Sequence, residues 1–366
     1  ALLSQPEVSD PNTPEELTTG LQMAQQALAL AQQAGDKHRE MHSLLAVGHL
    51  QQLHRDPAWH ELRARALELS RQLGDLRTEV GLLLGIGGAY SMDNLERNAE
   101  YVQAALSISQ RLEDRETEAW LLAALSPEHE RRGDYYRQLT EFEQKRVQIY
   151  REVGNRLGEG HALVFAGQIQ AIYLGDYEGG LAVLEEALDR WSESSDKIFA
   201  LLRIAQIQGE LGQFDAAWAT IAQARTVTER VLFSLGHAGL RLVEAILHNA
   251  QGGPEHWQQA LNLQAQVRQM VAEGQVSRQY QMVAACETAA AHLGLASVPD
   301  MAAPERDEHL RYALEASGNA LDIYRQFGFT QITECTGEEI MYRHSLALAA
   351  NGRHEEAQDM LKSAYR

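Results

Sequence analysis

Three segments far apart in the chain place their apolar residues in the same pattern. Each segment begins with Gly, has Tyr, Phe or His two places on, and has a small residue at the fifth step, Leu or Ile at the ninth and Ala at the twelfth. The segments are residues 175–187 (GDYEGGLAVLEEA), 212–224 (GQFDAAWATIAQA) and 352–364 (GRHEEAQDMLKSA). Steps of three and four place these residues on one face of a helix. We therefore expect three equivalent amphipathic helices, each preceded by a glycine turn.

A second recurring signal marks the turns between larger units. Gly closes a helix well because it adopts the left-handed conformation, and Asp or Asn directly after it can cap the next helix. Such an Asp or Asn occurs at positions 36, 75, 114, 155 and 196, so the successive spacings are 39, 39, 41 and 41. The sequence therefore predicts repeating units of two antiparallel helices joined by short connections, with a period of about 40 residues.

Small residues recur inside both helices of the predicted unit. The first helix carries Gly48, Gly87, Ser126, Gly167 and Ala205 in corresponding places, and the second carries Ala27-Leu28, Ala66-Leu67, Ala105-Leu106 and Ala187-Leu188. A residue without bulk lets the neighbouring helix approach closely, and alternating small and large groups interlock. One helix pair cannot bury its apolar faces alone, so we predict an all-α fold of stacked antiparallel pairs, a superhelix (solenoid) with a concave face.

These motifs resemble the tetratricopeptide repeat (TPR) family, whose second helix carries the Gly-Asp-Tyr-x-x-small-x3-Leu-x2-Ala pattern seen at residues 175–187. The resemblance implies a right-handed superhelix. The period of about 40 is longer than the 34 of the standard repeat, and HEAT or armadillo repeats span about 40 to 47 residues. The paired glycine and small-residue columns nevertheless favour TPR. The long-period form resembles the repeat regions of bacterial maltose-activator-type regulators, signal-transducing ATPases and some adenylate cyclases.

The pattern predicts a single array over residues 1–366. Within it we expect an N-terminal extension (1–12), regular repeats (13–235), degenerate repeats (236–293), a loop (294–309) and C-terminal repeats (310–366). The first helix resembles a second-helix element without its partner. The chain also opens with ALLSQ and ends at AYR in what reads as a helix. These features suggest a piece of a longer protein.

Composition narrows the possible functions. The chain has 51 acidic and 32 basic residues, and its net charge of −19 opposes direct binding of nucleic acid by this segment. Its two cysteines, Cys286 and Cys335, lie far apart in the sequence and outside any metal-binding spacing, which is typical of a reducing, cytoplasmic compartment. The sequence contains no apolar run of the roughly 20 residues that span a bilayer, so we expect no membrane segment.

Candidate binding residues follow from the family resemblance. It implies that two residues of each first helix face the concave side: the residue six places before, and the residue one place after, the recurring small residue of that helix. These positions are His42, Trp120, His161 and Phe199 in one row, and His49, Gln168 and Gln206 in the other. Aromatic and amide side chains can stack on and hydrogen-bond a peptide or a small ligand. The alternative is that the aromatic residues pack between helices and the polar ones are simply solvated.

Chemistry beyond binding has little support in the sequence. His38, His42 and His49 share one helix face, but only His38 and His42 are close enough for one ion, and no carboxylate ligand is evident beside them. We therefore expect no metal site and no cofactor. The phosphate-loop, dinucleotide-binding, serine-hydrolase and zincin motifs are absent from the sequence, and we expect no catalytic residues and no enzyme activity.

The leading hypothesis is a non-enzymatic binding domain, the sensor or docking arm of a larger cytoplasmic signalling or transcription-regulatory protein. Its partner would be a protein or peptide, or a small-molecule effector, and binding would change the pitch of the superhelix. The alternative is a constitutive protein–protein scaffold without switching. An enzyme on a helical-repeat scaffold is a third hypothesis. The identity of the partner and the oligomeric state are left open by the sequence.

Overall fold

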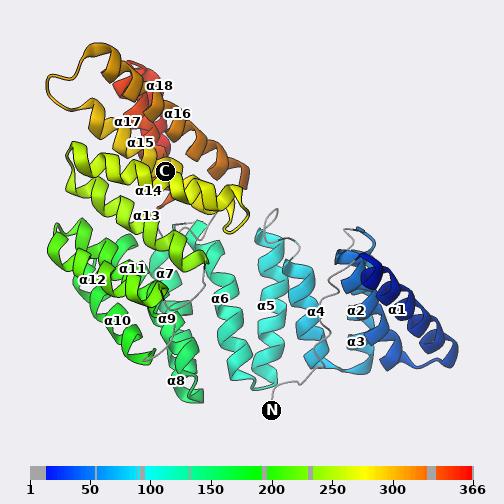
Figure 1. Cartoon of the computed structure of the whole chain (residues 1–366). Helices are drawn as coiled ribbons and strands as arrows, with labels where there is room; N and C mark the ends of the chain where they lie inside the picture. Colours follow the sequence, from blue (N-terminus) through cyan, green and yellow to red (C-terminus); the bar gives the residue numbers. More distant parts are fainter. Residues whose placement is uncertain are drawn as a thin grey trace. The chain divides into compact units, whose positions relative to one another are not determined.

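A computed structural model describes residues 14–53, 56–88, 90, 95–131, 133–191, 196–229, 234–327 and 335–364. Throughout these ranges the regular structure is helical, and helices alternate with short turns (Figure 1). The fold is an all-α helical repeat, as predicted. The predicted N-terminal extension, residues 1–12, lies outside the described residues.

The chain divides into two compact units, Ala1–Glu128 and His129–Arg366. The first unit contains α1 (Pro14–Ala34), α2 (Lys37–Leu53), α3 (Trp59–Leu73), α4 (Leu76–Gly88), α5 (Leu95–Arg111) and most of α6 (Arg115–Arg131). The boundary therefore falls near the end of α6, inside the range for which the sequence predicts uninterrupted regular repeats.

The second unit continues the alternation of first and second helices. It contains α7 (Tyr135–Arg137), η1 (Gln138–Glu143), α8 (Gln144–Val153), α9 (Arg156–Gln168), η2 (Ile169–Tyr173), α10 (Tyr177–Arg190), α11 (Lys197–Glu210), α12 (Phe214–Thr228), α13 (Ser234–Gln251), α14 (Pro254–Ala272), α15 (Arg278–Ala296), α16 (Ala303–Phe327), α17 (Gly337–Ala350) and α18 (His354–Ala364). Each first helix packs on the second helix that follows it, as in α9 with α10 and α11 with α12. The first helices α9, α11, α13, α15 and α17 also pack on one another in succession.

The turns between repeats have the predicted geometry. Gly74 ends α3 with φ of 69°, in the left-handed region, and Asp75 Oδ1 then accepts a hydrogen bond of 3.1 Å from the Thr78 amide. Asn155 caps α9 in the same way. In the turn before α6, Glu113 takes the left-handed conformation in place of Gly, with φ of 54°. The prediction is wrong at Asp196, whose side chain does not cap α11 because its backbone is already helical.

The small-residue column marks points of close approach between the helices of a pair. A Cβ added to Gly167 on α9 would lie 2.8 Å from Leu184 Cγ and 2.9 Å from the Gly180 carbonyl oxygen on α10. A Cβ added to Gly180 would lie 2.7 Å from the Gly167 carbonyl oxygen. The two glycines therefore let the two backbones approach to a distance that a side chain at either position would prevent.

The two longer spacings coincide with π-helical segments. The interval from Asp114 to Asn155 contains η1, and the interval from Asn155 to Asp196 contains η2. A π-helical turn accommodates an inserted residue within a continuous helix. These segments therefore take up part of the difference between repeats of 39 and 41 residues while the helices continue to stack.

The C-terminal part is more regular than its sequence suggests. The degenerate region forms complete helices, and the turn between α13 and α14 replaces Gly-Asp with Gly252 and Gly253, whose φ angles are 72° and 97°, followed by Pro254. The loop predicted over residues 294–309 is shorter, because α15 continues to Ala296 and α16 begins at Ala303. Pro304 lies in the first turn of α16, where proline is well tolerated. None of the described helices has the length and apolar character that crossing a membrane requires.

Candidate functional site

The first helices of the second unit line a cavity of about 210 Å³. Four consecutive first helices contribute to it, and most of the lining is apolar. The lining residues are His161, Val164, Phe165 and Gln168 of α9, Phe199, Leu202 and Arg203 of α11, Leu235, Gly236 and Gly239 of α13, and Tyr280 of α15. Gly239 lets α13 approach α11 closely at this point, since a Cβ there would lie 3.0 Å from Leu202 Cδ1.

Three of the candidate binding residues meet in this cavity. His161, Gln168 and Phe199 line it, whereas Gln206 is not among the lining residues and accepts a hydrogen bond of 2.7 Å from Arg203 Nη1. His161 and Gln168 are seven residues apart on α9, so two helical turns bring them to the same face. The sequence-based positions on α9 and α11 therefore lead to one cavity, and binding there stays a prediction.

Gln168 has an unusual position for an amide side chain. The residue is 5% exposed, and its Oε1 has no hydrogen-bond partner among the residues that the structure describes. Leaving a buried acceptor unsatisfied costs about 1–3 kcal/mol. A hydrogen-bond donor that reached this oxygen would recover this free energy.

His161 presents a neutral imidazole to the cavity. Burial lowers its pKa below the ordinary value, the charge of Asp196 opposes the shift, and the charge of Arg146 adds to it. The ring makes an edge-on contact with Trp191, with 5.0 Å between the ring centroids, and a tilted contact with Phe199 at 6.4 Å. At neutral pH the residue is therefore a neutral aromatic ring, with one nitrogen that can donate and one that can accept a hydrogen bond, rather than a cation.

The other three candidate residues belong to the first unit. His42 and His49 are exposed on α2, and Trp120 on α6 is 53% exposed, a high value for a tryptophan. They do not line the cavity, which is built from residues of the second unit.

His42 has a different set of neighbours from the one the sequence suggests. The ligand atoms of His38, His42 and Asp75 all lie within 4.8 Å of one another. The interpretation that no carboxylate accompanies the two histidines is therefore wrong. Asp75 lies in the turn that opens α4, and sequence spacing alone could not bring it to α2.

A column of buried glutamates was missed in the sequence. Each lies four residues after a capping Asp or Asn in the first turn of a first helix. The column consists of Glu40, Glu79, Glu118 and Glu159, which are 2%, 8%, 3% and 5% exposed. Each pairs with at least one arginine: Arg65, Arg71, Arg115 and Arg151, respectively. The spacing of 39, 39 and 41 could have revealed the column, since it follows that of the turns.

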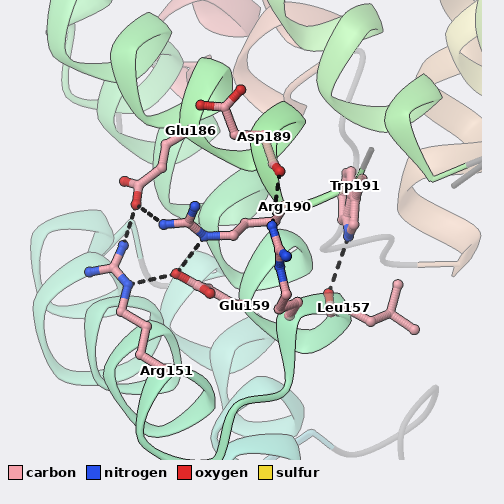
Figure 2. Close-up of polar contacts among 8 residues, drawn as sticks. Arg151, Leu157, Glu159, Glu186, Asp189, Arg190 and Trp191 are labelled. Carbon is pink, nitrogen blue, oxygen red and sulfur yellow. Dashed lines mark hydrogen bonds and ion pairs between the residues drawn. The ribbon is translucent and has the colours of Figure 1, made fainter. Parts of the chain in front are cut away.

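Glu159 is the member of this column whose ion pairs reach both neighbouring second helices (Figure 2). Its Oε1 accepts from Arg151 Nε of α8 at 2.6 Å and from Arg190 Nε of α10 at 2.9 Å, and both arginines also contact Glu186 Oε1. Burial raises the pKa of Glu159, but the hydrogen bonds from the two arginines outweigh it, so the pKa lies below its ordinary value. The ion-pair ring therefore joins three successive helices through an ionised carboxylate.

A second cavity, of about 350 Å³, is lined by residues of α8, α9 and α10. Val147 and Val183 contribute apolar surface to it, and Arg151 and Glu186 bring part of the ion-pair ring to its edge. Of these two cavities, the one between α9, α11, α13 and α15 contains predicted binding residues.

Comparison with known proteins identifies the fold. No protein-family model matches the sequence, and a search of curated proteins finds no match. Among solved structures, the yeast Tom70 crystal structure is similar with a TM-score of 0.50 and 15% identity, covering 93% of this chain and 60% of that one. A Rap protein complexed with Competence and Sporulation Factor gives a TM-score of 0.49 and 12% identity, and the match covers 96% of this chain and 88% of that one. A tetratricopeptide repeat protein from Parabacteroides merdae gives a TM-score of 0.31 and 14% identity, and the match covers 73% of this chain and 99% of that one.

At these identities the similarity concerns the fold. The Tom70 match, together with the helix pairs and turns described above, supports a TPR-type helical repeat. The chain spans less than two thirds of the Tom70 structure. The finer resemblance to bacterial regulators stays a prediction.

Proposed function

We propose that this chain is a non-enzymatic repeat domain that binds a peptide segment of a protein partner in the cavity between α9, α11, α13 and α15. The observation that carries the proposal is the buried, unpartnered Oε1 of Gln168, a residue that lines a mostly apolar cavity. A peptide offers both an apolar side chain for the cavity and a backbone N–H for the amide oxygen.

The volume favours one large side chain over a complete small molecule. A cavity of about 150 Å³ lined by aliphatic and aromatic residues holds benzene, whereas pockets for drug-sized ligands span about 300–1,000 Å³. At about 210 Å³ the cavity fits a Phe, Leu or Met side chain of the partner. A small-molecule effector is therefore the weaker alternative.

The chemistry of the lining supports binding rather than catalysis. Among the described residues around the cavity, the ionisable side chains are the neutral His161 imidazole, the buried Arg203 guanidinium and the Tyr280 phenol. This set supplies no carboxylate to act with the imidazole as a general acid or base. The net charge of −19 opposes direct nucleic-acid binding and favours basic or neutral peptide partners.

Within a cell we propose that the domain serves as the sensor or docking arm of a larger cytoplasmic signalling or transcription-regulatory protein of bacterial type. The resemblance of the turns and second-helix motifs to such regulators supports this role. Because each repeat contacts mainly its neighbours, a ligand that changes the packing of α9, α11 and α13 can change the pitch of the stack.

The binding test is a selection from a phage-displayed library of random peptides, followed by affinity measurements with the best peptide. Leu235 lines the cavity and is 40% exposed, so Leu235→Asn should leave the fold intact and weaken binding by about tenfold, as expected when one apolar contact is lost. Leu211 is also 40% exposed but lies outside the cavity, so Leu211→Asn is the matched control. Equal effects of the two variants, or no selected peptide, would contradict the proposal.

A separate measurement distinguishes a sensor from a constitutive scaffold. Small-angle scattering of the chain with and without saturating selected peptide should show a changed profile for a sensor. A constitutive scaffold would also bind the peptide, but its scattering profile would stay unchanged.

A further inference from the structure

Three potential metal ligands converge in the first unit, whereas the peptide cavity belongs to the second. His38 and His42 lie one helical turn apart on α2, with their ring centroids 4.7 Å apart. Asp75 comes from the turn between α3 and α4, and one ligand atom from each of the three residues lies within 4.8 Å of the others. Ligands at about 2.1 Å from a tetrahedral ion lie about 3.4 Å apart. Small rotations of exposed side chains are therefore enough to close the site.

The carboxylate is held in place by the fold. Asp75 Oδ1 accepts from the Thr78 backbone amide at 3.1 Å, and Oδ2 accepts from the Thr78 hydroxyl at 2.7 Å. Each carboxylate oxygen can accept more than one interaction. The capping bonds thus fix the orientation of Asp75 and leave a lone pair available, as outer-shell hydrogen bonds do at known metal sites.

We propose that His38, His42 and Asp75 bind a divalent transition-metal ion, with Zn²⁺ the best fit to two imidazole nitrogens and one carboxylate oxygen. The histidines are exposed and Asp75 is half-buried, so the fourth coordination position faces solvent. That position can take water or a side chain of a partner protein. The ion ties α2 to the start of α4 and so links the first helices of two successive repeats.

The site is independent of the proposed peptide cavity, because all three ligands belong to the unit Ala1–Glu128. An experiment can therefore support the zinc site and contradict the peptide cavity, or contradict the zinc site and support the peptide cavity. His49 is also exposed and lies on α2, seven residues beyond His42, but it does not belong to the cluster.

The test is titration of the chelator-treated full chain with ZnCl₂ by calorimetry, together with the absorption spectrum of the Co²⁺ form. We expect one tight site and a Co²⁺ spectrum with imidazole-coordinated d–d bands. His38→Ala, His42→Ala and Asp75→Asn should each weaken Zn²⁺ binding by at least about tenfold. Alanine is favourable in a helix, and asparagine caps as well as aspartate, so each variant keeps its helix.

The control is His49→Ala, which should bind Zn²⁺ with wild-type affinity. Other histidine pairs, such as His248 with His256, are present in all variants and contribute the same weak background. The proposal is overturned if the wild type shows no Zn²⁺ binding above that background. It is also overturned if Asp75→Asn binds like the wild type, or if His49→Ala loses as much affinity as His42→Ala.

Discussion

The ion-pair ring around Glu159 gives the most direct test of how the repeats are held together. Glu159 is 5% exposed and accepts charge-assisted hydrogen bonds from Arg151 and Arg190, whereas the Glu186 side chain is 37% exposed and contacts the same two arginines. Replacing each glutamate with glutamine removes the charge and keeps the shape. The two variants therefore differ chiefly in the burial of the carboxylate.

The expected magnitude follows from these contacts. A hydrogen bond to a charged group contributes about 1.5–3 kcal/mol, against about 0.5–1.5 for a neutral one, so two weakened bonds suggest about 2 kcal/mol. The arginine side chains are 47% and 28% exposed and can be rehydrated, which reduces the loss. We expect Glu159→Gln to lower the free energy of unfolding by about 1–2 kcal/mol, and Glu186→Gln by about 0.5 kcal/mol or less.

The assay is urea unfolding followed by circular dichroism at neutral pH and at a series of lower pH values. Because the pKa of Glu159 is below its ordinary value of 4.5, ionisation favours the folded state, and the stabilisation is present above that value. The difference between wild type and Glu159→Gln should therefore shrink as the pH falls through the folded-state pKa. Equal losses in the two variants, or a difference that does not depend on pH, would refute the reasoning.

Three further outcomes follow from the packing and burial of single residues. In thermal unfolding, Gly180→Ala should destabilise the fold by about 1–3 kcal/mol, because its Cβ would lie 2.7 Å from a backbone carbonyl oxygen of the facing helix. The control Gly81→Ala, whose Cβ meets nothing within 4 Å, should be neutral or stabilising. A Gly180→Ala variant as stable as wild type would contradict the close approach of the two helices. The thiols of Cys286 and Cys335, both buried and 3.7 Å apart, should resist a thiol reagent until the chain unfolds. The hydrogen bond to Cys286 and burial raise the pKa of Cys335, whereas for Cys286 the hydrogen bond from Cys335 lowers the pKa but burial and the nearby carboxylates outweigh it; rapid labelling of native protein would refute this. Burial, together with the nearby His309 and Arg268 side chains, lowers the pKa of His292 to about 4, so the neutral form of His292 favours folding. The free energy of unfolding should therefore fall between pH 6.5 and about 4 more steeply in wild type than in His292→Gln; parallel pH profiles would contradict it.

The repeat architecture was accessible from sequence because local signals determine it. Left-handed glycines such as Gly74 and capping residues such as Asp75 act within a few residues of their position, and the structure has both where the pattern predicts them. The failure at Asp196 has a local cause as well, since that residue is already helical. The loop at 294–309 was overestimated because prolines suit the first turn of a helix as well as a loop.

The site was only partly predictable, because the side chains of several repeats create it. Family register identified His161 and Phe199, but the contributions of Leu235 and Tyr280 depend on how α13 and α15 pack, which no local pattern encodes. The same reason explains why Asp75 was not connected with His42. The division into two units within α6 leaves no mark in the repeat pattern.

The central claim is that a peptide side chain enters the cavity formed by the first helices. Methyl NMR of the chain with and without a selected peptide tests it most directly. We predict the largest shifts at Val164, Leu202 and Leu235, which line that cavity, and small ones at Val147 and Val183, which line the cavity at α8, α9 and α10. Shifts concentrated at Val147 and Val183 would place binding on the second helices and contradict the account.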